Sequence, residues 1–179
     1  MKTLIIGGSR SGKSALAVKW AAERSSSVCV IVTAVAADEE MAARIEAHRR
    51  ERPAGWVVRE APVRLGAALE QESASGAVVL VDCLTVWTAN CLWQGPPDYR
   101  CDMPRWRHER EALLEALHRT QAETIVVTNE VGTGVVPDTP AGRRFRDEHG
   151  WLNQAVAAVC DEVFLVTAGL PLRLKPALP

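Results

Sequence analysis

The chain has 179 residues, with 21 Lys and Arg against 22 Asp and Glu and a net charge of -1. This charge balance argues against a general nucleic-acid binder, which would be strongly basic, and a hydrophobic share of 47% argues against disorder. No apolar run approaches the roughly 20 residues of a membrane span, and no secretory leader is evident at the start. We therefore expect residues 1–179 to form one globular domain.

Short apolar runs alternate with longer stretches of helical character along the chain. In chain order we expect a strand at 3–6, helix 13–24, strand 28–33, helix 38–50, strand 56–58, helix 64–73, strand 77–81, helices 84–93 and 104–120, strand 124–128, helix 139–160, strand 163–167 and a short strand 172–174. Gly and Pro residues predict loops at 94–103 and 129–138.

The five cysteines argue against two classes of site. Their number is odd and they include no C-x-x-C pair, so neither a disulfide framework nor a zinc site is predicted. Cys29 and Cys160 have apolar neighbours and are expected to be buried as small hydrophobic residues. A reducing cytoplasm is the default location for such a chain.

The strongest signal is a motif that fits G-x-x-x-x-G-K-[ST] between the first predicted strand and the first predicted helix. Its residues are Gly7, Gly8, Ser9, Arg10, Ser11, Gly12, Lys13 and Ser14. The glycines let the backbone turn tightly so that its N–H groups surround a phosphate, and the helix N-terminus adds a favourable dipole. We expect Lys13 to reach the β- and γ-phosphates of a nucleotide, and the Ser14 hydroxyl to bind Mg²⁺.

Such a phosphate loop usually works with an acidic residue at the end of another apolar strand. The apolar run 78–81 is followed by Asp82, which we expect to bind the same Mg²⁺. The alternative role of Asp82 is to cap the helix that is predicted from Leu84. With the strand–helix alternation, the two motifs predict an α/β fold of the P-loop NTPase type, with a mainly parallel sheet and helices on both faces.

The motifs disfavour a Ras-like GTPase switch. Such a switch reads guanine with Asn-Lys-x-Asp after a strand, whereas residues 129–132 read Asn-Glu-Val-Gly. A small-molecule kinase stays open, because arginines after residue 99 offer a candidate phosphate-binding lid. These are Arg100, Arg105, Arg107 and Arg110, and the alternative is that they form a solvated helix face.

Residues 44–53 place one histidine among four arginines. On a helix, Arg44, His48 and Arg52 lie at i, i+4 spacing and share a face. Nearby cations lower the pKa of an imidazole and keep it neutral, so His48 is a candidate nucleophile toward a phosphorus that the arginines hold. From the residues alone, the alternative is an exposed polar helix. The other histidines, which we predict to lie at the surface, are His108, His118 and His149.

Over nearly its whole length, the chain resembles the bifunctional adenosylcobinamide kinase / adenosylcobinamide-phosphate guanylyltransferase family of cobalamin biosynthesis. The resemblance depends on the joint order and spacing of many short motifs, and no later motif is decisive alone. They are residues 7–14, Thr33-Ala34, 38–41, Arg44-Ile45, His48-Arg49, Arg52-Pro53, Trp56, Glu60-x-Pro62, 82–87, Asn90, 128–132, 134–137, 145–147, Gly150, 152–154, 168–171 and Lys175.

The resemblance implies two reactions. In the first, the γ-phosphoryl group of ATP or GTP is transferred to the aminopropanol hydroxyl of adenosylcobinamide. In the second, GTP guanylylates a histidine with release of pyrophosphate, and GMP then passes to adenosylcobinamide phosphate to give adenosylcobinamide-GDP. By position, the implied histidine is His48.

The resemblance also implies further contacts and an assembly. Besides the phosphate loop, the implied nucleotide-binding residues are Thr33, Ala34, Arg49, Arg52, Glu60 and Asp82. A homotrimer is implied, with the nucleotide site near a subunit boundary. Two alternatives stay open, namely a kinase or nucleotidyltransferase alone and a regulatory module that only senses ATP or GTP. A sensor has no use for a nucleophile such as His48.

Overall fold

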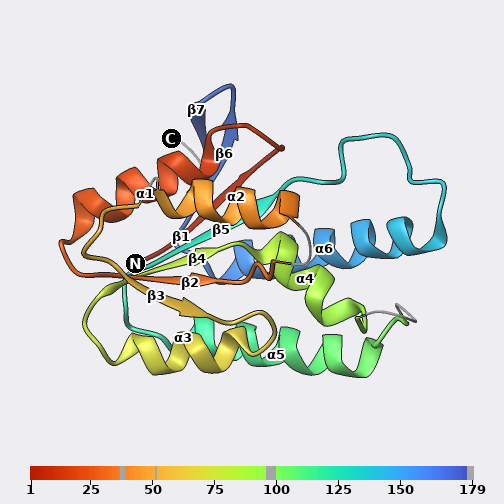
Figure 1. The fold of residues 1–179 in the computed structure, drawn as a ribbon, viewed down its shortest axis with the longest axis horizontal. Helices are drawn as coiled ribbons and strands as arrows, with labels where there is room; N and C mark the ends of the chain where they lie inside the picture. Colours follow the sequence, from red (N-terminus) through yellow and green to blue (C-terminus); the bar gives the residue numbers. More distant parts are fainter. Residues whose placement is uncertain (37–38, 51, 96–99, 177–179) are drawn as a thin grey trace.

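The computed structural model describes residues 1–36, 39–50, 52–95 and 100–176, and leaves the side chains at positions 40, 41, 44, 47 and 48 undescribed. Strands and helices alternate along the described chain (Figure 1). The strands are β1 (Lys2–Gly7), β2 (Val28–Val32), β3 (Val57–Glu60), β4 (Val78–Asp82), β5 (Thr124–Asn129), β6 (Glu162–Thr167) and β7 (Leu170–Lys175). The helices are α1 (Lys13–Arg24), α2 (Glu39–Arg50), α3 (Leu65–Ser73), α4 (Leu84–Leu92), α5 (Met103–Arg119) and α6 (Pro140–Val159).

The strands form one sheet in the order β3-β2-β4-β5-β1-β6-β7. Neighbouring strands are parallel except for β6 and β7, which form an antiparallel hairpin. Its tight turn uses positive φ angles at Ala168 (51°) and Gly169 (80°), as two-residue hairpin turns require. The predicted mainly parallel sheet is confirmed, and the carboxyl ends of β1, β4, β5 and β6 share the edge where open α/β sheets bind ligands.

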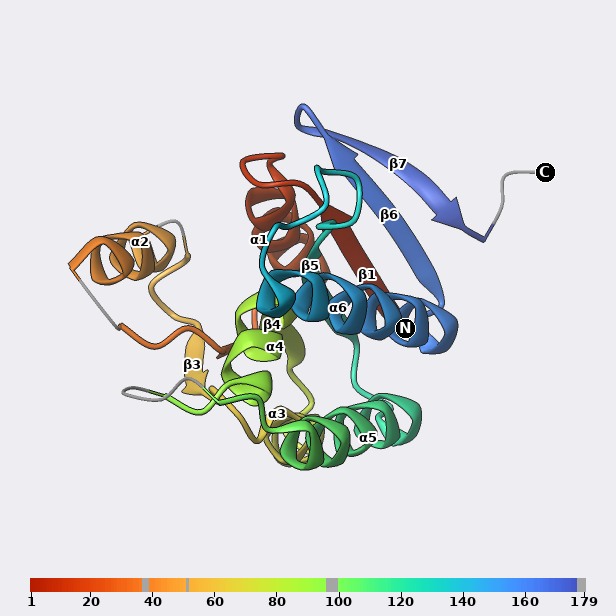
Figure 2. The ribbon, with the colours of Figure 1, turned by 90° about the vertical axis from the view of Figure 1, so that its right-hand side faces the viewer.

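Helices cover both faces of the sheet unequally (Figures 1 and 2). Helix α1 packs on β1, β4 and β5, whereas α3, α4 and α6 pack on the opposite face and α5 lies against all three. Alternate residues of the central strands enter the two resulting cores: Leu4 and Val79 join the α3–α6 side, and Ile5 and Leu80 join α1. Burial on both faces explains why these strands are continuously apolar. The predicted burial of the two cysteines at 29 and 160 is confirmed.

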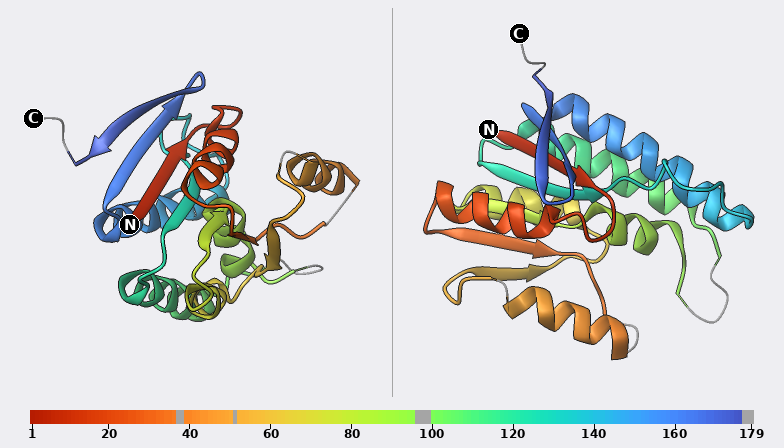
Figure 3. Two further views of the ribbon diagram at one scale, coloured as in Figure 1. Left: turned by 90° about the vertical axis from the view of Figure 1, so that its left-hand side faces the viewer. Right: turned by 90° about the horizontal axis from the view of Figure 1, so that it is seen from above.

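Helix α2 lies away from the other helices, on the side of the sheet where β3 is the edge strand, as the views in Figures 2 and 3 agree. All four residues of β3 are exposed, and most of the described α2 side chains are exposed too. This part therefore adds little to either core. Across the described residues, no helix combines the length and apolar character that crossing a membrane requires.

Arg105, one of the four arginines of the candidate lid, makes a structural contact instead. Asp102 caps α5 by accepting from the Arg105 N–H at 3.1 Å, and residues 96–99 of the predicted loop lie outside the described residues. The Arg105 guanidinium donates to the carbonyl oxygens of Asn90, Cys91 and Trp93 at 2.7–3.0 Å. Because the last carbonyls of a helix have no intrahelical partner, Arg105 has a structural role at the end of α4.

Candidate nucleotide-binding site

The phosphate loop turns between β1 and α1, and sterics require glycine at two of its positions. A Cβ atom at Gly7 would lie 2.6 Å from both Val166 O and Ser11 Oγ. Gly12 has a φ of 92°, and a Cβ atom there would lie 3.2 Å from Gly169 Cα. Other residues would clash or be strained. These glycines therefore serve the tight turn that the motif predicted.

Hydrogen bonds from two neighbouring strands hold the loop in place. Gly169, in the turn after β6, donates its N–H to Ser11 O at 2.8 Å, and Glu130, just after β5, donates to Gly7 O at 3.1 Å. The outer part of the loop is open to solvent. Its exposed residues are Gly8, Ser9, Arg10 and Gly12. These two hydrogen bonds hold the loop backbone on the side of the sheet, while its outer side is open to a phosphate.

Lys13 and Ser14 begin α1 at the end of the loop. The Lys13 side chain is largely buried, and its Nζ donates to Gly8 O at 3.1 Å. Burial lowers the pKa of Lys13, while nearby Cys83 and Asp82 act in the opposite direction. A bound phosphate would replace the neutral carbonyl with a charged acceptor, which makes a stronger hydrogen bond.

Asp82 ends β4 and forms an ion pair. Arg52 Nη2 donates to Asp82 Oδ2 at 3.0 Å, and their side chains are only 9% and 17% exposed. Thr33 stabilises the backbone at the end of β4. Its N–H donates to Asp82 O, and its hydroxyl donates to Cys83 O at 2.7 Å. Ala34 follows it and is half-buried. The N-cap of α4 is Cys83, without a side-chain cap, so the alternative role of Asp82 as a helix cap is not observed.

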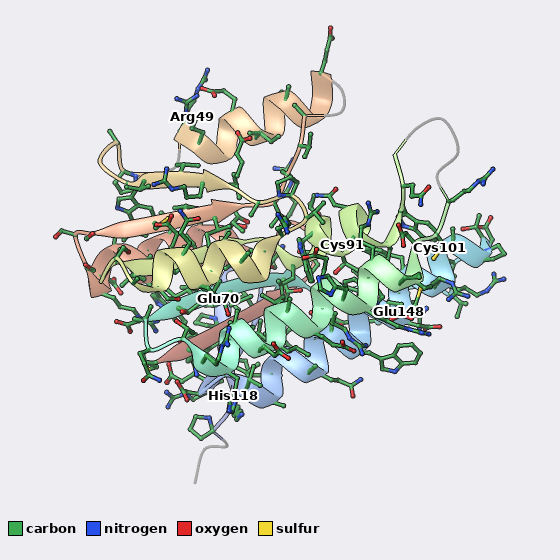
Figure 4. The ribbon with its side chains drawn as sticks, turned by 90° about the horizontal axis from the view of Figure 1, so that it is seen from below. Arg49, Glu70, Cys91, Cys101, His118 and Glu148 are labelled. Carbon is green, nitrogen blue, oxygen red and sulfur yellow. The ribbon has the colours of Figure 1, made fainter. Side chains whose placement is uncertain are left out.

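The other predicted site residues lie on the outlying part formed by α2 and β3. His48 is on α2, and its side chain lies outside the described part of the structure. Arg49 points away from the body of the molecule (Figure 4), with its guanidinium 3.9 Å from Glu46. Glu60 is exposed at the end of β3. The structure therefore brings Thr33, Arg52 and Asp82 together and leaves Arg49 and Glu60 open to solvent.

We predicted that Arg44, His48 and Arg52 share one face of a helix, and this prediction is wrong for Arg52. Helix α2 ends at Arg50, and the Arg52 side chain turns toward Asp82. Proline disfavours the helical conformation of the residue before it, and Arg52 precedes Pro53. The side chain of Arg44 lies outside the described residues.

His149 was predicted at the surface, and this prediction is wrong. The residue is fully buried, with Nδ1 3.0 Å from Thr88 Oγ1. Its Nε2 lies 3.1 Å from both Thr128 Oγ1 and Asn129 O. Burial lowers the pKa of His149 to about 4, although the Asn129 carbonyl and the charge of Glu130 oppose the shift. The imidazole is therefore neutral near pH 7 and joins α4, β5 and α6 beneath the site.

A pattern in the sequence indicates this burial. His149 lies at helical spacing from Phe145, Leu152 and Val156, which places it on the apolar face of α6. Phe145 stacks on the imidazole with ring centroids 5.5 Å apart, and Leu152 and Val156 are fully buried. The polar residues beside His149 in sequence point in other directions, since consecutive helix residues do not share a face.

A glycine-rich phosphate loop after β1 and an acidic residue ending β4 define an α/β protein of the P-loop NTPase type. Among solved structures, a prototypical ATPase from the type III secretion system of pathogenic bacteria aligns with a TM-score of 0.54 and 13% identity. The alignment covers 93% of this chain and 52% of that one. At this identity, the likeness shows the fold alone.

Sequence comparisons are more specific. The family model of cobinamide kinase / cobinamide phosphate guanyltransferase matches residues 3–174. The chain is 49% identical to the bifunctional adenosylcobalamin biosynthesis protein CobP of Pseudomonas aeruginosa, over 98% of each chain. It is 38% identical to the bifunctional adenosylcobalamin biosynthesis protein CobU of Escherichia coli K12, over 98% of this chain and 100% of that one. The chain therefore belongs to the cobinamide kinase / cobinamide phosphate guanyltransferase family.

Proposed function

We propose that this protein is a bifunctional transferase of cobalamin biosynthesis. It phosphorylates adenosylcobinamide with ATP or GTP, and then transfers GMP from GTP to adenosylcobinamide phosphate to give adenosylcobinamide-GDP. The observation that carries the proposal is the anchored phosphate loop, with Lys13 near Asp82, in a chain that matches the family model from residue 3 to 174. The family description names both activities, and the two relatives are called bifunctional proteins of adenosylcobalamin biosynthesis.

In the kinase step, the substrate hydroxyl oxygen bonds to the γ-phosphorus. The bond from that phosphorus to the bridging oxygen breaks, the nucleoside diphosphate leaves, and the hydroxyl proton is released to solvent. Lys13 and the N–H groups of the loop stabilise the charge on the transferred group and on the leaving phosphates. We assign the phosphates of the nucleotide to residues 7–14 as a whole.

The donors around the loop fit Mg²⁺. The Ser14 hydroxyl and the Asp82 carboxylate are oxygen ligands, which Mg²⁺ prefers, and it usually completes its coordination with phosphates and water. When bound, the ion neutralises charge on the β- and γ-phosphates. Asp82 accepts from Arg52 at 3.0 Å, so its carboxylate is oriented before a ligand arrives.

For guanylyl transfer, we propose His48 as the nucleophile. An imidazole nitrogen bonds to the α-phosphorus of GTP while the bond to the bridging oxygen breaks and pyrophosphate leaves. A phosphate oxygen of adenosylcobinamide phosphate then displaces the imidazole from the same phosphorus. We assign the GMP moiety to residues on the β2–α2–β3 side of the sheet, which are Thr33, Ala34, Arg49, Arg52 and Glu60.

We also propose a homotrimer located in the cytoplasm. The last strand β7 has three exposed leucines, with exposed fractions of 73% at Leu170, 57% at Leu172 and 49% at Leu174. An exposed apolar edge strand favours association with another chain. Sedimentation equilibrium tests the assembly: we expect a mass three times 19.5 kDa, and a monomer would contradict it.

A labelling experiment tests the guanylyl transfer, and a phosphoryl transfer assay tests the kinase. The protein is incubated with Mg²⁺ and GTP labelled at the α-phosphate, denatured, and examined for label, with His48→Ala as the control. We expect acid-labile, base-stable label on the wild type only, as a phosphoramidate requires. GTP binding without label on the wild type would contradict the histidine mechanism and leave a kinase or a nucleotide sensor. Transfer of the γ-phosphoryl group to adenosylcobinamide separates those two.

A further inference from the structure

A pocket of about 400 Å³ lies beside the phosphate loop, next to the β6–β7 turn. The loop forms one wall of this pocket, the segment after β5 forms a second, and the end of β6 forms a third. Among its lining residues are Arg10, Ser11, Glu130, Thr133, Val166 and Thr167. The resemblance implied no role for the walls beyond the phosphate loop.

The chemistry of this pocket suits a nucleoside. Leu165 and Val166 give it an apolar part, while Arg10 and Glu130 add charged groups of opposite sign. The Glu130 Oε1 atom accepts from Thr133 N at 2.9 Å, which orients the carboxylate and leaves Oε2 to accept from an amino or ribose hydroxyl group. A small-molecule site typically combines apolar walls with a few oriented polar groups in this way.

One buried hydroxyl in the pocket wall lacks a partner. Ser11 is 8% exposed, and its Oγ has no hydrogen-bond partner among the described residues. A buried polar atom without a partner costs free energy, so it marks a place where a ligand or water completes the hydrogen bonding. Ser11 belongs both to the phosphate loop and to the pocket, so one ligand can extend from the loop into the pocket.

The strand order gives the direction in which this ligand lies. Strand β1, which leads into the loop, has β5 and β4 on one side and β6 on the other. Asp82 therefore lies two strands from the loop strand, at about 4.8 Å per strand. The pocket lies over β1, between the segment after β5 and the end of β6, and so extends past β1 on the side away from Asp82. Phosphates that share Mg²⁺ with Ser14 and Asp82 extend toward β4. The nucleoside of the same molecule then points toward β6.

We propose that the pocket between the phosphate loop and the β6–β7 turn binds the purine nucleoside of the phosphoryl donor in the kinase step. In this orientation, the α-phosphorus is the phosphorus farthest from α2, which lies beyond β4 beside β2 and β3 (Figure 2). Guanylylation of His48 therefore needs GTP in the reverse orientation, with its nucleoside toward Arg52 and Glu60. The inference rests on the proposed function and adds two nucleotide orientations around one phosphate loop.

Binding measurements on variants whose substituted side chains fill the pocket test the proposal. Thr133→Phe and Thr167→Phe each add a ring to a different wall, and both residues are exposed in the free protein, so neither change disturbs a core. Val135→Phe adds the same ring to the same loop at a residue that is 95% exposed and outside the pocket. Isothermal titration compares two ligands with Mg²⁺ present, a non-hydrolysable ATP analogue and tripolyphosphate, which has no nucleoside.

We expect both pocket variants to bind the ATP analogue at least about tenfold more weakly, a difference of about 1.4 kcal/mol. Their affinity for tripolyphosphate stays that of the wild type, and Val135→Phe changes neither affinity. Wild-type affinity of both pocket variants for the ATP analogue would overturn the proposal, as would equal weakening of both ligands. Failure of the wild type to bind either ligand would instead overturn the proposed function.

The same variants test the second orientation. In the labelling experiment with α-labelled GTP, both pocket variants are expected to form the His48 adduct at the wild-type rate. Their rate of phosphoryl transfer from ATP to adenosylcobinamide falls at subsaturating ATP. Equal loss of both activities would overturn the reverse orientation, because a single binding mode would then serve both reactions.

Discussion

The buried imidazole of His149 makes the stability of the fold depend on pH. Its pKa is about 4 in the folded protein and about 6.5 in an unfolded chain. The unfolded state therefore binds the proton more readily, so stability is fully present above pH 6.5 and decreases as the pH falls toward 4. At about 1.36 kcal/mol per pH unit, the full loss is about 3 kcal/mol, of which about 2 kcal/mol falls between pH 7.5 and 5.0.

His149→Gln isolates this contribution, because glutamine does not titrate and still offers an amide to Thr128 and Asn129. At pH 7.5 we expect the variant to be less stable than the wild type by about 1–3 kcal/mol, the cost of imperfectly satisfied buried partners. At pH 5.0 the difference should narrow by about 2 kcal/mol. Urea unfolding followed by circular dichroism, at one fixed protein concentration, measures both differences. Parallel pH profiles for the two proteins would refute the reasoning, since carboxylates elsewhere titrate equally in both.

Three further substitutions have expected outcomes. Gly66→Ala places a Cβ atom 2.7 Å from the backbone of Ala112. We expect urea unfolding to show a loss of stability of about 1–3 kcal/mol, with unchanged activity per folded molecule. Arg52→Met removes the ion-pair partner of the largely buried Asp82 carboxylate and should lower the free energy of unfolding by about 1–3 kcal/mol; an unchanged value in urea unfolding would contradict the pairing. Lys13→Ala should lower the kinase kcat about 100-fold or more in a steady-state assay while thermal unfolding stays near that of the wild type.

Much of the fold can be predicted from the sequence because local patterns agree with the tertiary structure. The strand that ends at Asp82 and the helix that begins at Lys13 are both in their predicted places, since apolar runs and glycines act over a few residues. The antiparallel direction of β7 could not be predicted in this way. It depends on the two-residue turn at Ala168 and Gly169, which brings the strand back along its neighbour.

The site was harder to predict because its contacts are distant in sequence. Motif spacing predicted Lys13 and Asp82, but the ion pair joins Arg52 to a residue 30 positions away, and no local pattern encodes that pairing. The pocket likewise combines Ser11, Glu130 and Thr167 from three segments. Such combinations follow from the strand order, in which β1 lies between β5 and β6.

The charged groups of the site are already partnered within the protein, and this has a consequence for the reaction. Arg52 holds Asp82 at 3.0 Å, and Lys13 donates to the loop carbonyl of Gly8. Under the proposed function, a nucleotide competes for both groups, because Mg²⁺ takes carboxylate oxygens as ligands and phosphates accept from an ammonium. Arg52 lies two residues after the end of α2, so its contact with Asp82 links the region just after this helix to the end of β4. We therefore expect phosphate binding at the loop and the position of the His48 helix to be coupled.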